Sequence, residues 1–172
     1  IVAVAQFPLE AWQRTHEYDG IVLTFETQKL LEQLKPYEKD YVFASDGFSN
    51  AVTLGYNARH YFLVFGEGSS HARHDDILTD FRALDGRNIL ILRKTKPDLD
   101  YYEKFFHKVD IRSFKVRGVD FYIVLGRTFY YAAYRDDVLE WVREKYYAIP
   151  RWLPQNGCYF CDRYFPETPC CK

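Results

Sequence analysis

Short apolar runs alternate with segments of helical periodicity over the first hundred residues of the chain. Three unbroken apolar runs predict strands at 41–45, 61–65 and 88–92. An unbroken run, unlike an alternating one, is typical of a strand that is buried on both faces. Apolar side chains at helical spacing predict helices at 27–34, 49–59, 75–84 and 97–106. Strands that alternate with helices favour a parallel sheet with crossover helices.

The pattern changes in the last third of the chain. Residues 111–116 alternate between apolar and polar, Arg117-Gly118 suits a turn, and 119–129 reads as a long strand. Together they predict an antiparallel hairpin at the edge or end of the sheet. An amphipathic helix is expected at 136–147. The predicted fold is therefore α/β: a three-layer open sheet of mostly parallel strands with crossover helices, plus a C-terminal antiparallel hairpin.

The length of 172 residues fits one domain with a substantial core. We expect a junction segment at 1–17, an α/β domain at 18–149 and a cysteine-containing tail at 150–172. Aromatic residues make up 19% of the chain, which argues against a disordered protein. A net charge of −1 argues against nucleic acid as a partner. Because the sequence starts at Ile1, we expect a processed chain or a piece of a longer protein.

All four cysteines lie in the tail, at Cys158, Cys161, Cys170 and Cys171. Such a cluster indicates either disulfides or a zinc site. Two adjacent cysteines fit one tetrahedral zinc poorly, so two disulfides in an oxidising compartment are favoured and zinc is the alternative. One connectivity pairs Cys158 with either Cys170 or Cys171, and Cys161 with the other. A third interpretation is a disordered tail with incidental thiols.

The segment 66–76 is the first candidate ligand site, because it joins the end of a strand to the start of a helix. In open parallel sheets ligands bind at that edge. Hydroxyl donors and basic groups that can meet an anion near the helix start are Ser69, Ser70, His71, Arg73 and His74. With Asp75 and Asp76, metal binding is a further option. In the simplest interpretation the aspartates cap a helix and the histidines are solvated.

The preceding strand end, Ser45-Asp46-Gly47-Phe48-Ser49, is the second candidate. Asp46 can bind a sugar hydroxyl or cap the next helix, and Ser49 can contribute in either way. The Gly-x-Gly-x-x-Gly, Gly-x-x-x-x-Gly-Lys-Ser/Thr and Gly-x-Ser-x-Gly motifs are absent. The chain therefore lacks the common nucleotide-binding and serine-hydrolase signatures.

The order of several motifs resembles a known group of enzymes. Tyr18-Asp-Gly precedes a leucine-rich helix, Tyr41-Val-Phe-Ala-Ser-Asp precedes a helix that ends in Leu54-Gly-Tyr-Asn, and Asp75-Asp76 leads to Gly86-Arg87 before a strand. Over about residues 18–130, this resembles the soluble C-terminal domain of bacterial membrane glycosyltransferases of the dolichyl-phosphate-mannose protein mannosyltransferase superfamily. That superfamily includes the aminoarabinose transferases that modify lipid A.

The resemblance implies a parent protein with many membrane helices that uses a polyprenyl-phosphate sugar as donor. Its catalytic acidic residues would lie in the membrane part, so no catalytic residue is expected in this chain. The domain would lie on the periplasmic face of the inner membrane and assist in positioning the acceptor. The expected partners are the membrane portion of the same polypeptide and a glycan, lipid or protein acceptor. No cofactor is expected in the domain itself, apart from the zinc alternative at the cysteines.

Two other function classes stay open from the sequence. One is a small metal-dependent hydrolase or phosphoesterase that uses His71, His74, Asp75 and Asp76. The other is a protein-interaction module whose aromatic surface binds a partner.

Overall fold

The computed structural model describes residues 8–68, 74–150, 152–154 and 157–167. Its first half contains η1 (Leu9–Trp12), α2 (Tyr18–Phe25), α3 (Thr27–Leu34), η2 (Lys35–Tyr37), β1 (Val42–Ser45), α4 (Phe48–Ala58), β2 (Leu63–Val64), α5 (Asp75–Leu78) and η3 (Phe81–Leu84). Its second half contains β3 (Ile89–Arg93), α6 (Leu99–Glu103), β4 (Phe106–Val116), β5 (Val119–Phe129), α7 (Tyr131–Tyr134), the π-helical turn η4 (Arg135–Leu139), α8 (Glu140–Tyr146) and α9 (Tyr159–Tyr164).

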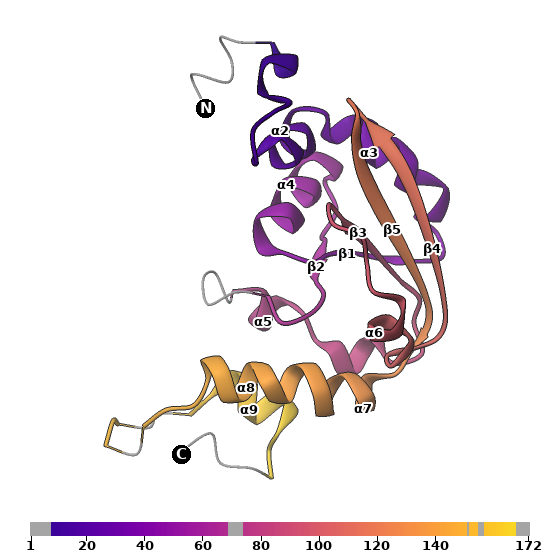
Figure 1. Cartoon of the computed structure of the whole chain (residues 1–172). Coiled ribbons are helices and arrows are strands. Elements are labelled where there is room, and N and C mark those ends of the chain that lie inside the picture. Colours follow the sequence, from indigo (N-terminus) through magenta and orange to yellow (C-terminus); the bar gives the residue numbers. More distant parts are fainter. Residues whose placement is uncertain (1–7, 69–73, 151, 155–156, 168–172) are drawn as a thin grey trace.

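The strands form one mixed sheet in the order β2-β1-β3-β5-β4 (Figure 1). β1 lies between β2 and β3 and pairs with both in parallel, with Ser45 opposite Val64 on one side and Leu92 on the other. β5 then pairs antiparallel with β3, and β4 pairs antiparallel with β5. The predicted three-layer sheet of mostly parallel strands is therefore wrong. The parallel pairings are short, and the longest strands are the antiparallel ones.

The hairpin explains this difference. Its turn residues Arg117 and Gly118 both have positive φ, at 50° and 81°, which is the pattern of a two-residue type I′ turn. Such a turn matches the strand twist, so the ladder extends back from Val116–Val119 to Phe106–Phe129. β4 consequently begins where the sequence predicts the end of a helix, and α6 stops at Glu103. β5 then lies inside the sheet beside β3.

Two hydrophobic clusters use alternate residues of the same strands. Leu90, Leu92 and Leu125 pack with the cluster that includes side chains of α2, α3 and α4. Ile89, Ile91 and Val124 pack with the other cluster, which includes side chains of α6, α8 and α9. Figure 1 shows α8 and α9 together at the end of the molecule below α5 and α6. β3 is buried on both faces because a cluster lies on each side of it, as its unbroken apolar run predicts.

An aromatic group around Tyr134 fills the second cluster. The Tyr134 ring is fully buried, with centroids 4.7 Å from Phe65, 4.8 Å from Phe81 and 5.3 Å from Phe129. Its hydroxyl accepts the Gly66 N–H at 2.7 Å, which satisfies both groups. Burial raises the pKa of Tyr134 well above its ordinary value, since the phenolate would be formed away from water. The high aromatic content therefore forms a packed core.

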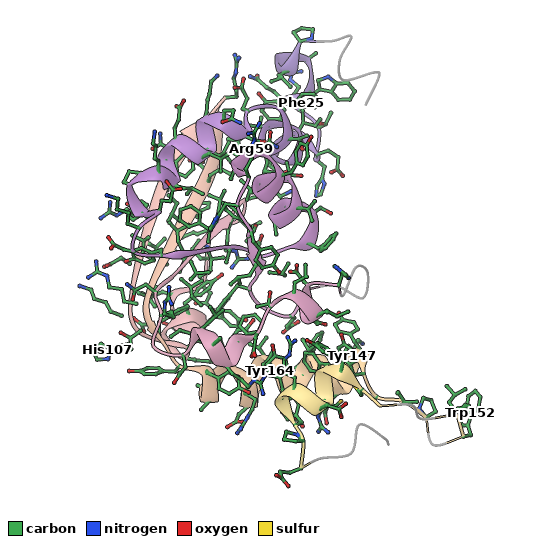
Figure 2. The ribbon with its side chains drawn as sticks, turned by 180° about the vertical axis from the view of Figure 1, so that it is seen from behind. Phe25, Arg59, His107, Tyr147, Trp152 and Tyr164 are labelled. Carbon is green, nitrogen blue, oxygen red and sulfur yellow. The ribbon has the colours of Figure 1, made fainter. Side chains whose placement is uncertain are left out.

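The described part of the tail belongs to this core. Phe160 of α9 stacks on Tyr147 with centroids 4.4 Å apart and planes at 3°. Figure 2 shows Tyr147 and Tyr164 at the end of the molecule that α8 and α9 form. The Tyr164 hydroxyl donates to the Thr79 carbonyl at 3.0 Å and accepts the Phe81 N–H at 3.2 Å. α9 thus fixes the segment that follows α5. Among the described residues, no helix has the length and apolar character needed to cross a bilayer.

Candidate functional site

The carboxyl ends of β1 and β3 form the first candidate site. From β1 the chain continues into α4, which packs in one hydrophobic cluster, and from β3 it continues into α6, which packs in the other. Neighbouring parallel strands whose connections leave toward opposite faces create a crevice at which ligands commonly bind. Asp46 and Arg93 directly follow the paired residues Ser45 and Leu92 at this point.

Asp46 forms an ion pair with Arg93, with the Nε–Oδ2 distance at 3.0 Å. The Arg93 guanidinium also donates to the Tyr102 hydroxyl at 3.1 Å and to the Thr95 hydroxyl at 3.0 Å. The Asn50 amide donates to the second Asp46 oxygen at 3.4 Å. Burial alone would lower the pKa of Arg93, but the nearby Tyr102 and Asp46 outweigh it and hold that pKa above its ordinary value. The polar side chains here are therefore engaged with one another.

Replacing Asp46 with asparagine is expected to destabilise the protein by about 2 kcal/mol, because a partly covered arginine loses its carboxylate partner. The Asp46 and Arg93 side chains are only 25% and 22% exposed. The measurement is the free energy of unfolding in urea. Asp137→Asn is the matched control, since its pair with Lys104 is more than half exposed on both sides and should cost less than about 0.5 kcal/mol. Equal effects of the two substitutions would contradict a stabilising role for the Asp46 pair.

Ser49 lies exposed in the first turn of α4 and forms no cap. The N-cap position of α4 is Gly47, in extended conformation, and no side chain caps the helix there. The option that Ser49 caps this helix is wrong, because Ser49 is already inside α4. Its neighbour Asn50 also lies inside α4 and bonds to Asp46.

The segment 66–76 is only partly described: Ser69, Ser70, His71 and Arg73 lie outside the described residues. His74 is exposed just before α5. The Asp75 carboxylate accepts the Tyr61 hydroxyl at 2.9 Å and the Val64 N–H at 3.0 Å. The Val64 N–H points away from β1, so Asp75 covers the open edge of the sheet at β2.

The second aspartate of α5 also has a structural partner. Asp76 accepts a hydrogen bond from the Tyr147 hydroxyl at 2.5 Å. The Arg163 guanidinium donates to the carbonyls of Asp76, Ile77 and Thr79, at 2.6–3.1 Å. Burial is the main cause of a raised pKa at Tyr61, with Asp75 adding to it. The carboxylates of α5 thus anchor this segment to β2 and to Tyr147, and Arg163 of α9 binds its backbone carbonyls.

Metal ligands do not gather in the described part of the chain, where no group of three or more His, Cys, Asp or Glu residues could hold an ion. Cys158 is a free thiol at the N-cap of α9, and its sulfur accepts the Cys161 N–H at 3.4 Å. Cys161 is disulfide-bonded. Cys170 and Cys171 lie outside the described residues.

A groove of about 430 Å³ beside α4 is the second candidate site, and sequence reasoning missed it. It runs between α4, the segment leading into β2, and α5. Its apolar lining includes Phe48, Val52, Tyr56, Phe62 and Leu78, and its basic lining residues are Arg59, His60 and His74. Tyr56 is 83% exposed and Leu78 is 58% exposed, so much of this apolar surface faces solvent.

The signal for the groove is present in the sequence of α4. Ala51 and Leu54 are buried on its inner face. Phe48, Val52 and Tyr56 recur every fourth residue and form a second apolar stripe on the outer face. A helix that carries two apolar stripes is expected to have one packed on the core and the other covered by a further element or a ligand.

A second cavity of about 280 Å³ adjoins the groove at His60. Its lining is more polar and includes Gln28, Glu32, Lys35, Glu38 and Asn57. The His60 ring packs edge-on against Phe43, with centroids 6.0 Å apart. The end of α4 therefore separates a strongly apolar site from a more polar one.

Comparison of this chain with protein-family models, with curated proteins and with solved structures gives no match.

Proposed function

We propose that this chain is an extracytoplasmic domain of a polyprenyl-phosphate-sugar-dependent membrane glycosyltransferase and that it helps to hold or position the acceptor. In this proposal the transfer chemistry belongs to the membrane portion of the same polypeptide, on the periplasmic face of the inner membrane. The sequence motifs between Tyr18 and Arg87 support the family, and the α4 groove supports the binding role.

The observation that carries the binding role is the groove itself. Concave, mostly apolar sites of a few hundred Å³ with a few polar groups are typical of small-molecule binding sites. The groove combines an apolar lining with basic side chains and remains open to solvent at Tyr56 and Leu78. The site at the carboxyl ends of β1 and β3 is less suited to this role, because Asp46 and Arg93 bind each other there.

The family assignment is tested by reading the coding sequence upstream of Ile1. Ten or more apolar segments of about 20 residues each are expected, since each is the length of a membrane-spanning helix. An upstream sequence without such segments would contradict the proposal.

The positioning role is tested in the whole membrane protein with Tyr56→Ser combined with Leu78→Ser. Both side chains are exposed, so the fold should be retained. The KM for the acceptor should rise about tenfold while kcat changes little, because the substitutions remove binding surface and no reacting group. The readout is transfer of labelled sugar from the polyprenyl-phosphate donor. A fall in kcat at unchanged acceptor KM would contradict this role.

A further inference from the structure

The basic side chains around the α4 groove are one guanidinium and two imidazoles. Arg59, His60 and His74 line it, and the acidic residue in the lining is Asp75. Both Asp75 oxygens already accept hydrogen bonds, one from the Tyr61 hydroxyl and the other from the Val64 N–H. The side chains of Arg59, His60 and His74 are all exposed. A ligand in this groove therefore meets the Arg59 guanidinium and two imidazoles, together with a carboxylate whose two oxygens already accept hydrogen bonds.

Arg59 has an unusual backbone for a residue with a large side chain. It ends α4 in the left-handed region with φ at 53°, and its N–H bonds back to the carbonyl of Tyr56 at 3.4 Å. Glycine or asparagine adopts this conformation with less strain. The backbone conformation at this helix end therefore does not favour arginine. A role for the Arg59 guanidinium in the groove would explain why arginine occupies the position.

We propose that the α4 groove binds one anionic amphiphile, with its hydrocarbon part along Phe48, Val52, Tyr56 and Leu78 and its acidic head at Arg59, His60 and His74. This inference rests on the proposed function for its biological setting and deepens it by naming the chemical class of the ligand. A guanidinium pairs well with phosphate or carboxylate oxygens, and the imidazoles add donors to them. The exposed apolar side chains would be covered by the hydrocarbon.

A peptide strand added to the edge of the sheet fits the same place less well. Such an addition needs free backbone groups along the edge strand. The edge strand β2 has only two residues, and its outward N–H, at Val64, is already bonded to Asp75. An apolar chain without hydrogen-bonding needs is the better occupant.

The test is calorimetric titration of the 172-residue chain with dodecyl phosphate below its micelle concentration. Saturable binding near one molecule per chain is expected. Dodecyl maltoside, which carries the same hydrocarbon chain on an uncharged head, should bind at least tenfold more weakly, and inorganic phosphate should show no comparable affinity. Equal binding of the charged and uncharged amphiphiles would overturn the proposal.

Two variants separate the head from the hydrocarbon. Arg59→Asn keeps a residue that tolerates the left-handed conformation, and it should weaken dodecyl phosphate binding about tenfold without weakening dodecyl maltoside. Val52→Ser combined with Leu78→Ser changes two exposed positions and should weaken both amphiphiles. Lys108→Thr and Ile111→Thr are the matched controls, because both lie exposed on β4 at the opposite edge of the sheet. Variants that bind like the controls would exclude this groove as the site.

Membrane docking is the competing outcome. If the chain binds phosphatidylglycerol vesicles but not monomeric dodecyl phosphate, the surface contacts a bilayer and the proposal of a single-molecule site fails. Failure here is distinct from failure of the proposed function. Amphiphile binding is measured on this chain alone, whereas the family assignment depends on the upstream sequence.

Discussion

Replacing Gly126 with alanine is expected to destabilise the protein by about 3 kcal/mol, the upper part of the range for overpacking a core. Gly126 lies in β5 between Ile89 of β3 and Val109 of β4. A Cβ at this position would lie 2.5 Å from the Phe106 ring. That ring is buried and cannot swing into solvent, since it packs 5.5 Å from both Phe65 and Phe129. The free energy of unfolding in urea measures the effect.

The matched control is Gly20→Ala, the same substitution in α2. A Cβ there would meet only the flexible end of Lys94, at 3.6 Å, so the alanine should gain up to about 1 kcal/mol of helix propensity. Combining Gly126→Ala with Phe106→Leu tests the cause. Because leucine leaves room for the new methyl group, the double variant should lose less unfolding free energy than the two single variants lose in sum. An additive result would show that the ring does not oppose the new methyl group.

Alkaline pH is expected to unfold the protein cooperatively above about pH 10, the ordinary tyrosine pKa. Burial is the main cause of raised pKa values at Tyr101, Tyr102, Tyr131, Tyr134 and Tyr164. In the folded state these phenols keep their protons, whereas in the unfolded chain they lose them at ordinary pKa values. The unfolded state therefore binds fewer protons above pH 10, so the stability present below that pH is lost as pH rises.

Tyrosinate absorbance and far-ultraviolet circular dichroism, followed together against pH, measure this effect. Exposed tyrosines should ionise without loss of secondary structure, and the buried ones should ionise only as the protein unfolds. Tyr134→Phe should make the decline of stability with pH shallower by about 1.4 kcal/mol per pH unit, because one phenol fewer loses its proton on unfolding. Tyr56→Phe is the control, because that phenol is 83% exposed and unfolding barely changes its contact with water. A single smooth ionisation with native circular dichroism throughout would contradict the prediction.

The sequence predicts some residues of the candidate site but not the contacts that they make. Asp46 was expected at a strand end where ligands bind, and it lies there, but its partner Arg93 is 47 positions away. The sequence does not show that these two groups neutralise each other. Asp75 is similar: helix capping and metal binding are both local interpretations, whereas the structure has it bonded to Tyr61 and Val64 across the edge of the sheet.

Several local elements could be predicted from the sequence. Unbroken apolar runs predicted strands close to β1, β2 and β3, and Arg117-Gly118 predicted the hairpin turn, because burial and turn chemistry depend on neighbouring residues. The tertiary structure alone decided that β5 lies between β3 and β4, which makes the sheet mixed. It also decided that the outer apolar stripe of α4 lines an open groove beside α5 and is not packed into the core. Strand order and helix contacts depend on pairings between distant segments, and hydrophobic periodicity specifies which face is apolar but not what covers it.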